Sequence, residues 1–472
     1  LRGAAWMDAW DRIAAAVGGS GPVNLEVVFD ADPAAPATWD ISLRADARNT
    51  RWDSVQMDAW RLEGRWRGSA GIGSLEWKNA AVGGVSFPAG RLRAAFDGRT
   101  LELREGEARA GAGAGAGPLR LSGTFDVETR ELRAALESGF SPHLLAPLLR
   151  ARRLRPQAAL AERFRFDSEP PAGKFEIAAG CGDRPFLRLS GQIQGDACGY
   201  RGVSNLLMKT GLLLDWTPDR AVLDLGPILV VRPEGLVQGR ARVDFSRAVA
   251  EAQGVSSADP RAVAAMLAPA LGLSLSRFRF EGPAQLAVSG ALDLDGAARH
   301  DLDLETDVRR AGLGWALADR CAFTLRLLGD TAYINEVDIE FCRGRIRGSG
   351  EAVGIGTGSE PVFRVSAEAA DVDFARLLEA RSGRPEDQIR GTLSGGLEAA
   401  GVAGAGAERR AEGRGWIRIR DGQMFKIPLF GGLSEFLGRI VPGLNLLMRQ
   451  TDARATFTVK DGRLHTDDAA IE

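Results

Sequence analysis

In the stretch DLDLETDV, residues Asp301–Val308, polar and apolar side chains alternate along the chain. A β-strand directs successive side chains to opposite faces, so the carboxylates lie on one face while Leu302, Leu304 and Val308 lie on the other. The same alternation recurs in Phe363–Glu368 and Ile417–Arg420. Strands with one wet and one dry face are typical of antiparallel sheets.

Short turn signals separate these strands and suit two-residue hairpins, so we expect consecutive strands to pair. They are Asp97-Gly98, Asp295-Gly296, Gly329-Asp330, Asp421-Gly422 and Asp461-Gly462. A second recurrent element places a glycine where we expect a strand to end, with a bend or bulge in the sheet. It occurs at Leu121–Gly123, Leu189–Gly191, Val288–Gly290, Gly348–Gly350 and Leu393–Gly395.

Helical patterns are few and follow strand endings. They cover Ser141–Arg150, Asp244–Leu271 with a new start at Pro260, and Asp371–Ala380. The similar phrases Val243–Arg247 and Val372–Arg376 indicate a long, degenerate repeat of several strands closed by a short helix. We therefore predict β-rich units at 1–150, 151–272 and 273–380, followed by an incomplete unit at 381–472.

These patterns together predict a mainly β protein, in which a long, curved antiparallel sheet is accompanied by a few short helices. The sheet either folds over on itself, as in a β-solenoid-like repeat, or stays open around an apolar guest. A longer amphipathic helix is expected over Leu429–Met448, either plugging the open end of the sheet or lying on a membrane surface. The small-residue run Ala110–Gly117 is expected to be a loop.

Composition excludes several classes of function. Lys and Arg number 60 and Asp and Glu 62, giving a net charge of −2, which argues against a nucleic-acid partner. No apolar run reaches the roughly 18 residues of a transmembrane helix. The opening Leu1-Arg2-Gly3 does not resemble a signal peptide, so we expect any membrane anchor to lie outside this chain.

Motifs that carry chemistry are missing from the sequence. The four cysteines, Cys181, Cys198, Cys321 and Cys342, have no metal-ligand spacing, so no metal site is predicted. The pairs Cys181/Cys198 and Cys321/Cys342 are either disulfides in an oxidising compartment or small buried side chains. No nucleophile can be paired with a base, so we predict neither catalytic residues nor a cofactor, and not an enzyme.

The C-terminal stretch supplies a family resemblance. Gly413–Met424 forms a strand-DG pattern, Ile427–Phe430 opens a helix after Pro428, and Thr456–Leu464 is a second strand-DG-strand pattern. Upstream, Phe323–Gly350 repeats the order of strand, GD turn and strand. This arrangement resembles the C-terminal region of AsmA-like proteins.

The resemblance implies a long, strongly curved antiparallel sheet that is taco-like in cross-section, with an apolar groove as its interior. It further implies a periplasmic protein that is tethered to the inner membrane of a double-membraned bacterium. It also implies that the protein carries lipid between the inner and outer membranes or assists outer-membrane assembly, with phospholipid or another acyl-chain lipid as ligand and further envelope proteins as partners.

Period-2 alternation selects the residues expected to line a lipid groove. They are Leu302, Leu304, Phe323, Leu325, Leu327, Ile417, Ile419, Phe457 and Val459. Such a dry face favours acyl chains through burial of apolar area. Two alternatives stay open, a purely structural β-rich scaffold with a filled core and a polysaccharide-processing β-solenoid enzyme.

Overall fold

The computed structural model describes most of the chain. The described residues are 23–30, 32, 38–52, 55–111, 116–151, 155–166, 169–267, 275–295, 300–384, 390–404, 406–422 and 452–471. They form two compact units. Unit 1 is Leu1–Pro233 with Arg242–Arg247, and unit 2 is Glu234–Ala241 with Ala248–Glu472. The residues of β14 (Gly235–Asp244) are divided between them.

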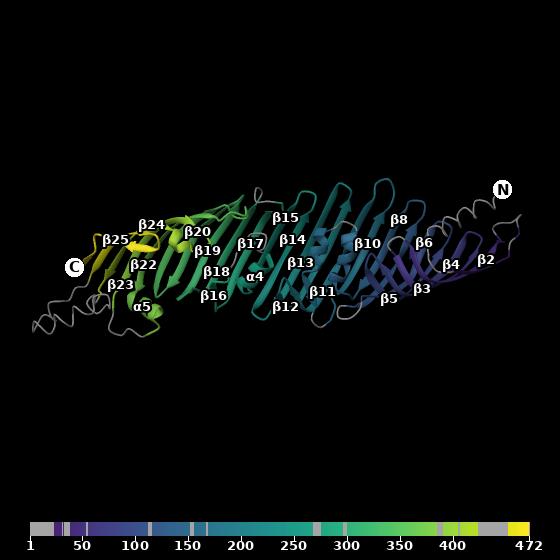
Figure 1. Cartoon of the computed structure of the whole chain (residues 1–472), viewed down its shortest axis with the longest axis horizontal. Coiled ribbons are helices and arrows are strands. Elements are labelled where there is room, and N and C mark those ends of the chain that lie inside the picture. The colour runs from purple at the N-terminus through teal and green to yellow at the C-terminus, as the bar shows by residue number, and fades with distance from the viewer. Residues whose placement is uncertain are drawn as a thin grey trace, which may run out of the picture. The chain divides into compact units, whose positions relative to one another are not determined.

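The described residues of unit 1 form thirteen complete strands and three short helices, coloured purple to teal in Figure 1. The strands are β1 (Val23–Asp30), β2 (Asp40–Trp52), β3 (Val55–Arg67), β4 (Ala70–Val82), β5 (Val85–Phe96), β6 (Thr100–Ala110), β7 (Gly117–Asp126), β8 (Glu131–Ser138), β9 (Phe164–Phe166), β10 (Ala172–Gly180), β11 (Phe186–Tyr200), β12 (Val203–Thr217) and β13 (Arg220–Arg232). The helices are η2 (Pro142–Leu145), α2 (Ala146–Ala151) and α3 (Arg155–Ala161).

Unit 2 is likewise built mainly of strands with a few short helices, and it is coloured teal to yellow in Figure 1. Its strands are β15 (Val249–Ser256), β16 (Phe278–Phe280), β17 (Ala284–Asp293), β18 (Asp301–Leu313), β19 (Ala316–Leu328), β20 (Thr331–Phe341), β21 (Gly344–Val353), β22 (Val362–Asp373), β23 (Thr392–Val402), β24 (Glu412–Arg420), β25 (Ala453–Lys460), β26 (Arg463–His465) and β27 (Ala470–Ile471). Its helices are α4 (Pro260–Leu267), α5 (Phe374–Ser382) and α6 (Ala407–Arg410).

Within each unit, strands that follow one another in the sequence pair in antiparallel fashion. In unit 2, β18 pairs with β19, β19 with β20 and β20 with β21. Each unit is an open sheet, because no pairing among the described residues joins β1 to β13 or β15 to β25. The prediction of a mainly β, antiparallel sheet with a few short helices is confirmed.

In two places, helical residues and a three-residue strand are inserted between two strands that pair with each other. After β8 the chain forms η2, α2 and α3, then the three-residue strand Phe164–Phe166, which pairs with the end of β11, while β10 pairs with β8. After β15 it forms α4, then Phe278–Phe280, which pairs with the end of β18, while β17 pairs with β15. Both short strands read Phe-Arg-Phe. This internal similarity supports a repeat, and the division at 150, 272 and 380 stays a prediction.

The helices agree with two of the predicted segments and correct the third. η2 with α2 covers Ser141–Arg150, and α5 covers the end of Asp371–Ala380, where the Asp373 side chain accepts a hydrogen bond from the Arg376 backbone N–H. The helix predicted from Asp244 is wrong over Val249–Ser256, which is strand β15. Pairing with β17 overrides the helix propensity of its alanine and glutamate. The expected helix Leu429–Met448 lies outside the described residues.

The turn predictions hold where consecutive strands meet. Asp97-Gly98, Gly329-Asp330 and Asp461-Gly462 connect β5 to β6, β19 to β20 and β25 to β26. The hairpin predicted at Asp421-Gly422 is wrong, because β24 pairs on one side with β23 and on the other with β25, which begins only at Ala453. The run Ala110–Gly117 is described only in part, and its ends face each other across β6 and β7.

The recurrent glycines lie inside strands and do not end them, which corrects the prediction. Gly123, Gly191, Gly290, Gly350 and Gly395 fall within β7, β11, β17, β21 and β23. They permit a close approach of neighbouring strands, since a Cβ atom on Gly191 would stand 2.2 Å from the carbonyl oxygen of Lys174. The predicted bulge is confirmed at three of these motifs, because register shifts in the neighbouring strand lie opposite Leu121–Gly123, Gly348–Gly350 and Leu393–Gly395. In unit 2 the extra residues of the neighbouring strands include the left-handed Glu336 and Asp371.

The packed core of unit 2 is small and lies near the ends of strands. One cluster joins Leu302, Leu327 and Ala332. Two more form at the opposite strand ends, one around Phe374 and Ile419 and one around Ala318, Phe341 and Val372. Across both units, the largest fully buried side chains in the described part of the chain are only Val222, Val308, Cys198 and Ser141. Among the described residues, no complete second layer therefore covers the large apolar side chains in the middle of the strands.

Candidate functional site

The structure brings the nine predicted groove residues to one side of the unit 2 sheet. Residues directly opposite each other on paired strands share a face. In β18 and β19, Leu302 stands opposite Leu327 and Leu304 opposite Leu325. The remaining members follow the same rule in other strands. Phe323 faces Thr306, Ile417 faces Ala455, Ile419 faces Ala453, Phe457 faces Gly415 and Val459 faces Gly413.

A continuous row across the sheet joins the two groups of predicted residues. It runs through Leu304, Leu325, Ile334, Gly350, Val365, Ala399, Gly413 and Val459, each opposite the next. A neighbouring row runs through Val337, Gly348, Ala367, Leu397, Gly415 and Phe457. We call this side of unit 2 the apolar face, and the opposite side the charged face. Sequence alternation alone could not reveal these rows, because they depend on the register between strands.

Burial separates the nine residues into two groups. Leu302, Leu327 and Ile419 are buried in the packed clusters at the strand ends. The other six are half-buried, as are Val365, Leu397 and Ala399 of the middle rows. The middle of the apolar face therefore combines apolar side chains with access from outside, whereas its ends are ordinary packed core.

Aromatic rings on this face lie over glycines, which keeps the layer of side chains thin. A Cβ atom on Gly415 would stand 2.5 Å from Cζ of Phe457, and one on Gly401 would stand 3.2 Å from Cζ of Phe363. Because each ring occupies the space above a residue without a side chain, it does not project far from the sheet. The sequence shows the glycines and the rings, but only the strand register shows that they meet.

The extent of the middle rows suits a hydrocarbon chain. Strands lie about 4.8 Å apart, so a row crossing from β20 to β25 spans roughly 24 Å. One leaflet of a bilayer has a hydrocarbon thickness of roughly 15 Å. A single acyl chain can therefore lie across these strands while contacting apolar atoms along its whole length.

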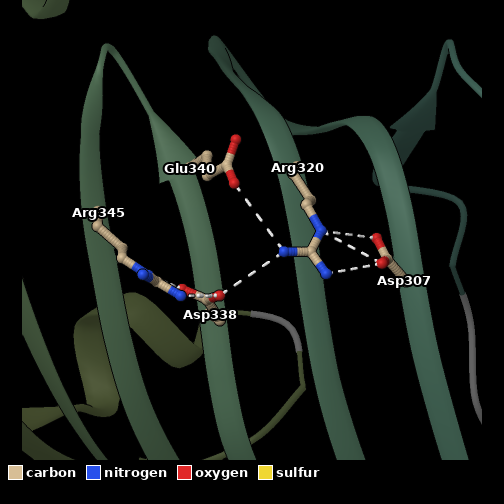
Figure 2. A network of polar contacts seen from close by, with 5 residues as sticks. All are labelled: Asp307, Arg320, Asp338, Glu340 and Arg345. Atoms are coloured by element: carbon tan, nitrogen blue, oxygen red, sulfur yellow. Dashed lines mark hydrogen bonds and ion pairs between the residues drawn. The ribbon is translucent and has the colours of Figure 1, made fainter.

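The charged face carries a network of ion pairs between strands (Figure 2). The Arg320 guanidinium donates to both carboxylate oxygens of Asp307, with Nη2 2.7 Å from Oδ2, and lies 3.8 Å from Asp338 and 3.9 Å from Glu340. Arg345 pairs with Asp338 from the next strand. Hydrogen bonds from Arg320 and Arg345 lower the pKa values of Asp307 and Asp338, respectively. The network links β18 to β21 and fixes their register.

Hollows also occur on the charged face, between its long side chains. One in unit 2 has a volume of about 690 Å³, with Ala287 and Ala322 between Gln285, Glu305 and Arg320. Unit 1 has hollows of about 650, 710 and 420 Å³, also lined by charged side chains. They arise where short residues interrupt the rows of arginine and carboxylate side chains, a feature that the sequence analysis missed.

The cysteines are dispersed. Cys181 is exposed after β10 and Cys198 is buried near the far end of β11, so this pair is not bridged, and Cys321 and Cys342 are not bridged either. Burial raises the pKa of the Cys321 thiol. In the part of the chain that the structure describes, no group of three or more His, Cys, Asp or Glu side chains is arranged to hold a metal ion.

Comparisons with protein-family models, curated proteins and solved structures find no match to this chain. Among the helices of the described residues, none is long and apolar enough to cross a membrane.

Proposed function

We propose that the apolar face of unit 2 binds acyl-chain lipid, and that the protein is a non-enzymatic component of a bacterial cell envelope. The observation that carries this proposal is the half-buried state of the middle rows, where no described residues form a complete second layer over Val365, Leu397 and Phe457. Covering such a surface with hydrocarbon is favourable by about 25 cal/mol for each Å² of apolar area removed from water.

The mode of binding follows from the chemistry of the two faces. The apolar face offers dispersion contacts and no charged partner, so it suits the hydrocarbon tail and not the head group of a lipid. The rows continue from strand to strand without a charged residue, which lets a tail shift along them at little cost. Conduction of lipid between the inner and outer membranes, or assistance in outer-membrane assembly, is the role we propose for such a surface.

The envelope setting rests on the resemblance of the C-terminal strands to AsmA-like proteins. β24 and β25 carry the residues of that resemblance and pair directly with each other. The proposal places the protein in the periplasm, tethered to the inner membrane through an anchor outside this chain, with envelope proteins as further partners.

A structural scaffold is the second candidate function. The packed clusters around Leu302 and Ile419 favour it, because they show that parts of the apolar face are filled by the protein's own side chains. If the protein is only a scaffold, its own side chains must also fill the middle rows, and the purified protein is expected to contain no lipid.

The experiment compares adjacent residues on opposite faces of β22. Val365 is half-buried on the apolar face and Ser366 is exposed on the charged face. We expect wild-type protein to retain phospholipid on purification, Val365→Asp to lose most of it, and Ser366→Asp to keep it. Lipid is measured by extraction and mass spectrometry, and folding by circular-dichroism melting of the same samples. Wild-type protein without lipid, or equal lipid in both variants, contradicts the proposal.

A further inference from the structure

The charged side of the unit 1 sheet carries two adjoining hollows with a shared wall. Both are lined by Arg65, Ile72 and Arg104, and their volumes are about 650 and 710 Å³. Arg44 and Arg93 also line the first. The strand register places Arg65 opposite Ile72 and Arg93 opposite Ser74, so these side chains project from the same side of β3, β4 and β5. We call this region the arginine hollow.

The floor of the arginine hollow is apolar, although it lies among charged residues. Ile72 is 60% exposed and Val28 is 61% exposed. Val28 has the short Ser42 opposite it, and Ile72 has the short Ala95 on one side and Arg65 on the other. An aliphatic patch that is ringed by arginines offers contacts to a ligand that is itself part apolar and part anionic.

The charge of the hollow favours anions. Over its two parts, five arginines line the hollow against four carboxylates, and in the first part alone four arginines stand against Glu26 and Glu63. Arg65 is held by two hydrogen bonds to Asp40, at 2.9 and 2.7 Å, and with Arg67 it keeps the pKa of Asp40 well below its usual range. Arg65 is therefore held in place at the centre of the site, and its charge is balanced by Asp40.

Arg93 and Arg104 are the groups that can turn to a ligand. Each has one carboxylate partner, Glu105 at 3.3 Å and Glu102 at 2.9 Å, and each side chain is more than half exposed. Ion pairs between exposed side chains contribute little free energy, so an incoming anion can replace them. The planar fork of a guanidinium matches two oxygens of a phosphate group.

The hollow in unit 2 provides an internal comparison. Its single arginine, Arg320, is paired with Asp307, and Glu305 and Glu336 also line it. Carboxylates exceed arginines there, so that hollow repels anions. Exposed aliphatic side chains, Leu236 and Val255, line that hollow too, so the excess of arginine is what distinguishes the arginine hollow of unit 1.

We infer that the arginine hollow binds an amphipathic phosphate, the head group of an anionic phospholipid. The phosphate contacts Arg93 and Arg104, and the adjoining apolar part of the lipid covers Ile72. This site lies in unit 1 and does not rest on the lipid-binding role proposed for the apolar face of unit 2.

The test uses the whole chain and vesicles of two compositions. Co-sedimentation compares phosphatidylglycerol–phosphatidylcholine vesicles with pure phosphatidylcholine vesicles at low and high salt. We expect preference for the anionic vesicles, and binding about tenfold weaker in the double variant Arg93→Gln/Arg104→Gln, which corresponds to about 1.4 kcal/mol. Ile72→Ser is expected to weaken binding of a soluble short-chain phosphatidic acid but not of inorganic phosphate.

The matched control is Arg133→Gln/Arg188→Gln, which removes two arginines beside the separate hollow of about 420 Å³ in the same unit. An equal loss in both double variants means general electrostatic attraction and overturns the inference. Unchanged binding in Arg93→Gln/Arg104→Gln also overturns it, and so does displacement of vesicles by inorganic phosphate as effectively as by the short-chain lipid. Arg93→Lys/Arg104→Lys keeps the charge but not the fork, and an intermediate affinity supports the phosphate contact even where the glutamine variant folds poorly.

Discussion

The indole of Trp77 lies across Gly90, the residue directly opposite it on the neighbouring strand. A Cβ atom on Gly90 would stand 2.0 Å from Cζ2 of that indole. Trp66 has the same relationship with Gly71, where a Cβ atom would stand 2.3 Å from Cδ1 of the indole. Glycine opposite an aromatic residue is therefore used in unit 1 as well as at Phe457 and Gly415 in unit 2. In both units it allows large rings on the sheet without a thick layer of side chains.

The Trp77–Gly90 relationship predicts a contrast between two glycine substitutions. Gly90→Ala must displace the indole and is expected to reduce the free energy of unfolding by about 1–3 kcal/mol. Gly73→Ala, on the adjacent strand, is expected to change it by less than about 1 kcal/mol, because the nearest atom is the Glu63 carbonyl oxygen at 3.4 Å. Urea unfolding of both variants measures the difference, and equal effects contradict the role assigned to the ring.

Position 419 is predicted to report on folding and not on ligand binding. Ile419 is 8% exposed and packs with Phe374, so Ile419→Asp buries a carboxylate and is expected to cost several kcal/mol. Ile419→Val, which removes one methylene, is expected to cost about 0.5–1.5 kcal/mol. Val365→Asp should be tolerated better, because water reaches that position. Thermal melting of the three variants checks this order, and a melt of Ile419→Asp that matches wild type contradicts it.

Acid is predicted to weaken the ion-pair network of Figure 2. The pKa values of Asp307 and Asp338 are lowered in the folded protein, so these groups bind fewer protons there than in the unfolded chain. Their contribution to stability is complete above the ordinary aspartate pKa of about 4 and is lost as the pH falls through the lowered values. Arg320→Gln should therefore lower the melting temperature by a smaller amount at pH 2 than at pH 7. If the difference in melting temperature between wild type and Arg320→Gln is the same at both pH values, the network does not contribute to stability in this way.

The cysteines are predicted to differ sharply in reactivity. Cys181 is exposed, whereas Cys198 is 0% exposed and its thiol donates to the Gly195 carbonyl oxygen at 3.6 Å. A thiol reagent should modify Cys181 in the native protein and Cys198 only after unfolding. Peptide mass spectrometry after timed labelling distinguishes them, with Cys181→Ser as the control. Equal rates at the two positions contradict the burial of Cys198.

Much of the fold could be predicted from local sequence, because alternation and turn residues act over a few positions. The strand Asp301–Leu313, the hairpin at Gly329-Asp330 and the helix after Asp373 follow from such signals. The strand Val249–Ser256 could not be predicted, because its partner β17 lies beyond a helix and decides its conformation.

The candidate site was less accessible to sequence reasoning. Alternation assigns residues to a face, but it does not say which members of that face are packed. Leu327 and Leu325 have the same pattern in the sequence, yet only Leu327 belongs to the buried members of a cluster. That difference depends on strand ends and on contacts with distant elements such as Ile355. The arginine hollow likewise depends on register across β1 to β6.

The most direct measurement of lipid binding on the apolar face is photo-crosslinking at two adjacent alanines of β23. Ala399 is half-buried on the apolar face, and Ala400 is exposed on the charged face. A photoreactive amino acid is placed at each position, the protein is produced in a double-membraned bacterium, and adducts are identified by mass spectrometry. We predict phospholipid adducts at position 399 and none at position 400. Absence of lipid adducts at position 399, in protein that folds as wild type, contradicts the proposal.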